Sequence, residues 1–268
     1  MARRIIASAD DPLLDPYRSL KETNPTRDAG GFVAEGRRLF TRLVELKWPL
    51  ESVLVSDHDL EGETAPLLEK LSEETPVYVL PRDELRRLIG FKFHRGIMTR
   101  AKSRPTPTLE EIAKSTRRIV ICGALRDPSN LGSVARSAAA FGWEALVVGP
   151  STPDAYSRRT LRTSMGAVLR MAVAIEDDEA LVVQRLRNEF GFSVYAGEAT
   201  AESVAFDRLE VTERVALILG NEDEGVPAAV LAKCTAVAAI PMTDRVESLN
   251  VASAAAILLQ RFGNVQRR

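Results

Sequence analysis

Short apolar runs alternate with helical patterns through residues 117–262, and this alternation constrains the fold more than any other feature of the sequence. Runs of four or five mainly apolar residues suit buried strands, and the segments between them carry apolar residues at helical spacing. Such alternation predicts a parallel sheet with helices on both faces, and ligands in such sheets bind outside the carboxyl ends of the strands. The expected strands are 118–122, 145–148, 193–196, 215–219 and 236–240, and the expected helices are 131–141, 157–169, 179–190, 227–232 and 249–262.

Residues 32–100 show a second, shorter alternation. Strands are expected at 32–34, 53–55 and 77–80, and helices at 37–46, 65–71 and 82–89. The following stretch, 99–116, is polar and contains Pro105 and Pro107, which favours an extended linker. A chain of 268 residues has room for about two domains. We therefore expect a smaller N-terminal α/β domain in 1–103, a linker in 104–116 and a larger α/β domain in 117–268.

The composition excludes several classes of protein. Apolar residues make up 45% of the chain and charged residues 27%, as in ordinary soluble globular proteins. No apolar run approaches the roughly 18 residues of a membrane span, and the N-terminus lacks the apolar core of a signal peptide. Only two cysteines, Cys122 and Cys234, and two histidines are present, all far apart in sequence. We therefore expect a cytoplasmic protein with no disulfide framework, no metal site and no membrane partner.

Basic residues are clustered, although the net charge of the chain is only −1. Residues 82–104 contain eight lysines and arginines against two acids, and residues 156–175 contain four arginines and no acid. Local basic patches of this kind indicate contacts with phosphate, and the alternative is a solvated charged face. The candidates for RNA contact are Arg95, Arg100, Arg158, Arg159 and Arg162.

The loop after the expected strand 118–122 has an unusual composition. Asp127, Pro128 and Asn130 favour a turn, and Asn130 is a candidate cap of the next helix. Arg136 follows on a helix that is otherwise small and apolar. A lone arginine on such a surface pairs with a carboxylate or phosphate, so a structural ion pair and a ligand contact both remain open.

Two further loops follow expected strands. In the first, Gly220 and Gly225 bracket acidic residues that include Glu222, and the alternative to a ligand loop is an acidic surface turn. In the second, Ile240 ends a strand and residues 241–247 lead to Ser248, Leu249 and Asn250 at a helix start. Ser248 is the expected N-cap, and Ser248 and Asn250 could serve only to cap the helix.

Several common catalytic motifs are missing from the sequence. There is no G-x-G-x-x-G, which argues against a Rossmann dinucleotide site, and no P-loop. Neither H-E-x-x-H nor G-x-S-x-G occurs. These absences disfavour an NAD-dependent oxidoreductase and the commonest hydrolases.

The three loops together, Asn130-x5-Arg136, then Leu219-Gly-Asn-Glu-x-x-Gly225, then Ile240-Pro-Met…Glu247-Ser-Leu-Asn-Val251, closely resemble a known set of motifs. They are the signatures of the SpoU (TrmH) family of RNA ribose 2′-O-methyltransferases, in the SPOUT superfamily, and the resemblance covers about residues 118–262. Phe32-Val-Ala-Glu-Gly-Arg37 and His94-Arg-Gly-Ile97 resemble the start and end of the substrate-binding extension of such enzymes, which is related to ribosomal protein L30e.

The resemblance implies a C-terminal parallel-sheet SPOUT domain with a deep trefoil knot, preceded by an L30e-like RNA-binding domain. It also implies a homodimer, and the final helix, 249–262, is apolar on nearly every side as a buried interface helix would be. Gly220, Ile240 and Leu249 would contact S-adenosylmethionine. Arg136 would be catalytic, as a base, a phosphate ligand or an oxyanion ligand. Asn130, Glu222, Ser248 and Asn250 would support it.

The implied reaction transfers a methyl group from S-adenosylmethionine to a ribose 2′-hydroxyl. Within the family, ribosomal RNA of the large subunit is the favoured substrate for this architecture, and transfer RNA is the alternative. A non-catalytic RNA-binding protein that retains the fold is a second alternative, although Asn130, Arg136 and Gly220 are all present. The sequence leaves the nucleotide open, as well as the choice between free RNA and a ribosomal particle.

Overall fold

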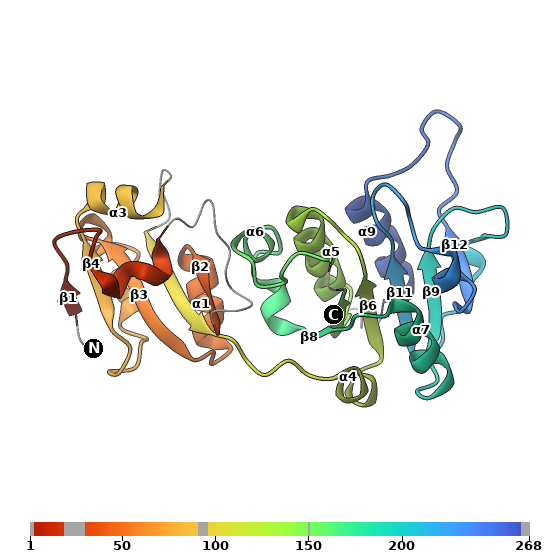
Figure 1. Ribbon diagram of the computed structural model, residues 1–268, viewed down its shortest axis with the longest axis horizontal. Helices are drawn as coiled ribbons and strands as arrows, with labels where there is room; N and C mark the ends of the chain where they lie inside the picture. Colours follow the sequence, from red (N-terminus) through yellow and green to blue (C-terminus); the bar gives the residue numbers. More distant parts are fainter. Residues whose placement is uncertain (1–2, 19–29, 91–95, 150, 264–268) are drawn as a thin grey trace. The chain divides into compact units, whose positions relative to one another are not determined.

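The computed structural model describes residues 3–18, 30–90, 96–149 and 151–263 (Figure 1). The chain forms two compact units. Unit 1 comprises Met1–Arg104 and Tyr156–Leu169, and unit 2 comprises Pro105–Ala155 and Arg170–Arg268. Each described sheet belongs to one unit.

Unit 1 is built on a five-stranded mixed sheet in the order β1-β4-β3-β5-β2. Strand β5 runs antiparallel to both of its neighbours, and the other pairings are parallel. Alternate strand residues enter two apolar clusters, so that Val53 and Val55 pack with Phe40 while Leu54 packs with Leu14. The elements are β1 (Arg3–Ile5), β2 (Gly31–Glu35), α1 (Arg37–Glu45), β3 (Leu50–Ser56), α2 (Ala65–Leu68), β4 (Val77–Leu80), α3 (Arg82–Ile89), β5 (Ile97–Lys102) and α6 (Arg158–Thr163), with 3-10 helices η1 (Pro12–Tyr17) and η2 (Asp57–Asp59).

The segment around α6 contacts strand β2 within unit 1. The ring of Tyr156 stacks on Phe32 with centroids 5.3 Å apart, and Trp48 meets both rings edge-on. Beside this aromatic group, Arg158 donates to the carboxylate of Glu35 at 3.1 Å. These contacts explain why residues 156–169, expected in the C-terminal domain, cluster with unit 1.

Unit 2 contains a seven-stranded sheet in the order β10-β12-β9-β11-β6-β7-β8, and every pairing in it is parallel. The predicted parallel sheet is therefore confirmed. Its elements are α4 (Leu109–Ser115), β6 (Arg118–Cys122), α5 (Pro128–Ala140), β7 (Ala145–Val148), β8 (Ala172–Ile175), α7 (Glu179–Asn188), β9 (Ser193–Gly197), β10 (Val204–Ala205), β11 (Val215–Leu219), α8 (Ala228–Leu231), β12 (Ala236–Ala239) and α9 (Val251–Phe262), with the 3-10 helix η4 (Phe206–Arg208).

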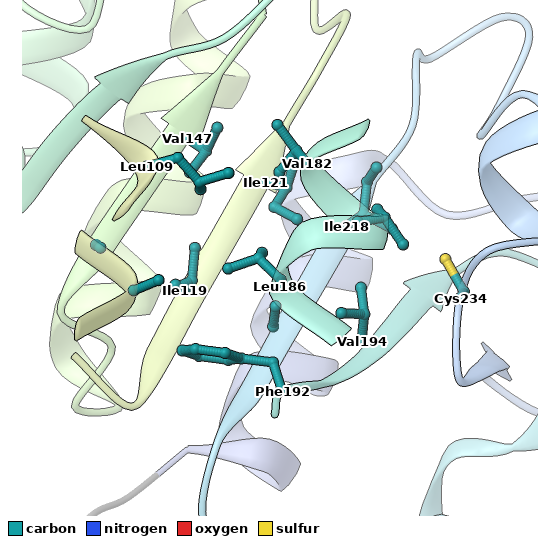
Figure 2. Close-up of a cluster of buried hydrophobic side chains, with 14 of the residues drawn as sticks. Leu109, Ile119, Ile121, Val147, Val182, Leu186, Phe192, Val194, Ile218 and Cys234 are labelled. Carbon is teal, nitrogen blue, oxygen red and sulfur yellow. The ribbon is translucent and has the colours of Figure 1, made fainter. Parts of the chain in front are cut away.

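Helices cover both faces of this sheet. One face packs against α4, α7 and α8, and Figure 2 shows Val182 and Leu186 of α7 lying over Ile121 and Ile218 of the strands. The intervening strand residues, including Val120, are also buried. They point to the opposite face, because successive side chains of a strand alternate.

Helix α9 packs against α5 and the sheet, which accounts for much of its apolar surface. The indole N–H of Trp143 donates to the carbonyl of Leu259 at 3.0 Å, and Arg118 donates to the carbonyl of Phe262 at 2.7 Å. Tyr195 stacks on Phe262 with centroids 4.8 Å apart. These contacts fix the last helix against the strands that carry the candidate site.

Three sequence predictions were wrong in detail. The stretch 99–116 is not an extended linker, because it contains the end of β5 and helix α4. A capping box between Thr108 and Glu111 starts α4, and its apolar side chains enter the unit 2 core. The expected helix 157–169 ends at Thr163, because Met165 and Gly166 both have positive φ, and a 3-10 turn, η3 (Ala167–Arg170), follows. Strands β1, β5, β8 and β10 were not predicted.

Candidate active site

Four loops leave the carboxyl ends of the neighbouring strands β12, β9, β11 and β6. Because these strands are parallel and adjacent, the loops that follow them meet at one edge of the sheet. Three of them are the loops that the sequence singled out, at 123–130, 220–226 and 240–250. The fourth follows β9 and begins at Gly197.

A chain of hydrogen bonds joins the three predicted loops. The amide Nδ2 of Asn130 donates to Oε1 of Glu222 at 2.8 Å, and Nδ2 of Asn250 donates to Oδ1 of Asn130 at 3.2 Å. The backbone N–H of Arg126 donates to the second oxygen of Glu222 at 3.2 Å, and the side chain of Arg126 pairs with Asp223 at 2.6 Å. Asn130, Glu222 and Asn250 thus form one connected polar group.

The carboxyl group of Glu222 is held as a carboxylate. Burial on its own would raise the pKa, but the hydrogen bonds from Asn130 and from nearby backbone N–H groups outweigh it and lower the pKa below its usual value. Hydrogen bonds to the charged form have this effect because they are lost when the group is protonated. Glu222 is therefore an acceptor that fixes the orientation of the Asn130 amide.

The glycines of the second loop are required by its backbone. Asn221 and Gly225 exchange two N–H···O=C bonds of 3.0 Å, which closes the loop tightly. A Cβ atom on Gly220 would overlap the backbone of Gly225 and Val226. Gly225 itself has φ +69°, a conformation that favours glycine. Nδ2 of Asn221 donates to the carbonyl of Ala124 at 2.9 Å and ties this loop to the end of β6.

Two of the predicted helix caps were wrong. Asp127, not Asn130, caps α5 by accepting from the N–H of Ser129 at 2.8 Å, with Pro128 at the first helical position. Asn250, not Ser248, caps α9 by accepting from the N–H of Ala252 at 2.9 Å. Because the cap of α9 uses only Oδ1 of Asn250, its Nδ2 remains available for Asn130.

A pocket of about 200 Å³ lies beside this polar group, between the loops after β9 and β12 and the start of α9. Ile240 and Leu249, predicted as cofactor contacts, line it together with Ser248. Gly220, the third predicted contact, is not among the lining residues. The remaining lining residues are Gly197, Glu198, Ala199, Ala238, Met242, Glu247, Ala254 and Leu258.

Sequence reasoning missed Glu198, which lies in the loop after β9. Its Oε2 accepts from the backbone N–H of Val226 at 2.9 Å, and the carboxylate occupies the space beside the Cα of Gly225. Glu198 therefore joins the wall of the pocket to the glycine loop. Its position directly after a central parallel strand is the signal that could have identified it.

Arg136 lies on α5 and its side chain is exposed. Within the described residues it forms no ion pair or side-chain hydrogen bond, so the structural ion pair left open by the sequence is not observed. Six residues along a helix turn by about 600°, so Arg136 and Asn130 lie on different faces of α5. The structure therefore brings together Asn130, Glu222 and Asn250 but does not connect them to Arg136.

Residues 117–260 match the model of the SpoU rRNA Methylase family. The chain belongs to the SpoU family. An uncharacterised tRNA/rRNA methyltransferase of Mycobacterium bovis is 31% identical over 261 residues, which cover 94% of this chain and 88% of that protein. The 23S rRNA (guanosine(2553)-2′-O)-methyltransferase RlmP of Bacillus subtilis is 38% identical over 150 residues, which cover 56% of this chain and 59% of RlmP.

A solved structure matches the fold of this chain along nearly its whole length. The AdoMet-bound rRNA methyltransferase from Sinorhizobium meliloti superposes with a TM-score of 0.84 at 24% identity, and the match covers 97% of both chains. This likeness shows that the chain shares the fold of that enzyme.

Two of the five arginines of this SpoU-family chain that were predicted to contact RNA form ion pairs inside unit 1. Arg100 is only 11% exposed and pairs with Glu51 at 2.9 Å, and Arg158 pairs with Glu35. Arg95 lies outside the described residues. Arg86 and Arg87 pair with acids, and Arg104 stacks over Trp48. Within the stretch 82–104, Arg82 and Lys102 are exposed and form no described ion pair, so they join Arg159 and Arg162 as exposed candidates for RNA contact.

Within the parts of the chain that the structure describes, no three His, Cys, Asp or Glu side chains are grouped so as to hold a metal ion. None of the described helices is both long and apolar enough to cross a membrane.

Proposed function

We propose that this SpoU-family chain transfers a methyl group from S-adenosylmethionine to a ribose 2′-hydroxyl of RNA. The observation that carries the proposal is the hydrogen-bonded group of Asn130, Glu222 and Asn250 next to the pocket that Ile240, Ser248 and Leu249 line. The family match and the names of the relatives support RNA methyl transfer, and the printed name of RlmP supports the 2′-oxygen as acceptor.

The residues of the pocket fit S-adenosylmethionine. Ile240, Leu249 and Leu258 offer apolar surface for an adenine ring, which suits a small, mainly apolar binding site. Glu198 and Glu247 place carboxylates on a pocket for a ligand that carries a sulfonium and an ammonium group. Gly220 lies in the loop that Glu198 holds, and its backbone is the part that could contact the ligand. When bound, the cofactor supplies an electrophilic methyl group.

The chain has to position the ribose and assist loss of the hydroxyl proton. Arg136 is the candidate for contact with RNA at the reacting centre, because its guanidinium is exposed and has no described partner. A guanidinium is charged at all physiological pH values, so a phosphate or developing oxyanion suits it better than the role of base. Asn130 and Asn250 present oriented amides, and Ser248 offers a hydroxyl at the pocket.

We extend the proposal to the assembly that the family resemblance implies. Loops 220–226 and 240–250 would belong to a trefoil knot, residues 1–103 would form an L30e-like RNA-binding domain, and two chains would form a homodimer. Exposed Leu249 and Ile257 near and on α9 support the dimer, because large apolar side chains on a surface favour association. In a dimer, the exposed Arg136 could reach the site of the partner.

Ribosomal RNA is the substrate we favour, and large-subunit RNA within it. RlmP, whose name assigns it to 23S rRNA, shares 38% identity with this chain over the matched part. Transfer RNA remains the alternative, since the mycobacterial relatives carry both substrates in their names. The direct test offers S-adenosylmethionine labelled in the methyl group to total rRNA and, separately, to total tRNA.

Label in rRNA that disappears with Asn130→Ala supports the proposal and its substrate. Label in tRNA alone would keep the reaction and change the substrate. If the protein binds S-adenosylhomocysteine but labels neither free RNA nor ribosomal subunits, the methyl-transfer proposal fails and the non-catalytic RNA-binding alternative is favoured.

A further inference from the structure

Unit 1 contains a pocket of its own, separate from the SpoU motifs. It has a volume of about 370 Å³ and lies at the start of α1 and the end of α6. Its lining residues are Glu35, Gly36, Arg37, Arg38, Leu39, Arg162 and Met165. Three of these residues, Arg37, Arg38 and Arg162, carry guanidinium groups. The pocket therefore has the composition of an anion-binding site.

The backbone adds donors to the same pocket. Gly36 is the N-cap of α1 with φ +96°, and no side chain caps the helix. Among the described residues, no acceptor contacts the backbone N–H groups of Arg37, Arg38 or Leu39. The first N–H groups of a helix need a partner and carry the positive end of the helix dipole, which makes an uncapped helix start a site for phosphate.

The three arginines are only weakly engaged. Arg162 is exposed and forms no described ion pair, and the described side-chain contact of Arg38 is with the sulfur of Met165 at 3.4 Å, a weak acceptor. Arg37 pairs with Glu63, but that carboxylate is 76% exposed and such a surface pair is worth little. An incoming phosphate could therefore recruit all three side chains at low cost.

The one carboxylate among the lining residues, that of Glu35, already has an arginine partner. Glu35 is 5% exposed, and Arg158 donates to its carboxylate at 3.1 Å. Because Arg158 balances this charge, Arg37, Arg38 and Arg162 leave the pocket with an excess of positive charge.

We propose that this pocket binds one backbone phosphate of the RNA substrate, with the start of α1 and the side chains of Arg37, Arg38 and Arg162 as its donors. This inference rests on the proposed RNA methyltransferase function. Such a contact fixes the position of the RNA but does not read its sequence. Arg158 does not line the pocket, and it contributes by neutralising the lining carboxylate of Glu35.

The test compares RNA affinity at several salt concentrations for the wild type and the double variant Arg38→Gln/Arg162→Gln. Loss of one phosphate contact should weaken binding about tenfold at low salt and make the slope of log affinity against log salt shallower by about 0.7–0.9. The matched control is Arg3→Gln/Arg4→Gln, which removes two exposed arginines of unit 1 that lie outside both basic stretches, 82–104 and 156–175. The control should keep the wild-type slope.

Equal slopes for the double variant and the wild type would overturn the inference, as would equal weakening by the control. Circular dichroism and the affinity for S-adenosylhomocysteine, which binds in unit 2 under the proposed function, check that the variant is folded. The single variant Arg162→Gln repeats the test at a side chain with no described ion pair. A wild-type protein that binds S-adenosylhomocysteine but no RNA would instead refute the proposed RNA substrate, and this inference with it.

Discussion

Asn130 donates a hydrogen bond of 2.8 Å to Glu222, and this contact joins two loops that are 92 residues apart in the sequence. The same Asn130 accepts from Asn250 through its other amide atom. Each atom of the amide thus has one fixed partner, which determines its orientation. Glu222 keeps this arrangement only while it is ionised, because a protonated carboxyl group is a poorer acceptor.

Asn130→Asp should therefore damage the site without unfolding the protein. The new carboxylate would face Glu222 and could not donate to it, and two like charges at this distance repel each other. We expect methyl transfer to fall at least about tenfold, which corresponds to about 1.4 kcal/mol of activation free energy. Asn188→Asp, at the exposed end of α7, is the matched control and should keep wild-type activity. Unchanged kcat in Asn130→Asp would show that the amide orientation is irrelevant.

The pKa of Glu222 predicts a pH-dependent contribution to stability. Its pKa is lowered from the ordinary value of 4.5, so its stabilisation is present above that pH and is lost as the pH falls through the lowered pKa. The wild type should exceed Glu222→Gln in the free energy of unfolding at pH 7, by less than about 1 kcal/mol because the side chain is exposed to solvent. Urea unfolding of both proteins at pH 7 and at pH 4 measures the difference. A gap that widens at pH 4 would contradict the assignment.

Glu198→Ala should weaken cofactor binding more than it weakens catalysis. The substitution frees the N–H of Val226 and removes a carboxylate from the pocket wall, so the loop 220–226 loses its anchor. We expect KM for S-adenosylmethionine to rise about tenfold with a smaller change in kcat, and calorimetry with S-adenosylhomocysteine to show the same loss. Glu198→Gln should recover part of the affinity, because its amide oxygen can still accept from Val226. Glu202→Ala, an exposed acid in the same loop region, should change neither value.

Arg136→Ala should abolish most activity and leave the stability of the chain unchanged. The side chain has no described partner, so its removal costs no internal contact. Arg136→Lys should also be poorly active if the planar fork of the guanidinium binds a phosphate or an oxyanion. Thermal unfolding and methyl-transfer rates of both variants are compared with Arg208→Ala, an exposed arginine elsewhere in unit 2. Full activity in Arg136→Lys would refute the proposed role of the planar guanidinium. Full activity in Arg136→Ala would show that Arg136 is not part of the active site.

The strands could be predicted where apolar runs are continuous, as at Val77–Leu80 and Arg118–Cys122. Helix α4 was missed because Pro105 and Pro107 dominated the interpretation, although Thr108 and Glu111 carry the spacing of a capping box. The three candidate loops could be singled out because each follows an expected parallel strand, whereas the roles of their residues came only from the family resemblance. The partners of the basic residues could not be predicted from the sequence. Arg158 and Glu35, for example, are 123 positions apart, and only the folded chain brings them together.

The position of the transferred methyl group tests the central claim most directly. A methyl on the 2′-oxygen blocks alkaline cleavage of the adjoining phosphodiester, because that cleavage uses the 2′-hydroxyl as its nucleophile. RNA labelled by the wild-type protein should therefore release its label in alkali-resistant dinucleotides after complete alkaline hydrolysis. Label recovered in mononucleotides would place the methyl group on a base and contradict ribose 2′-O-methylation.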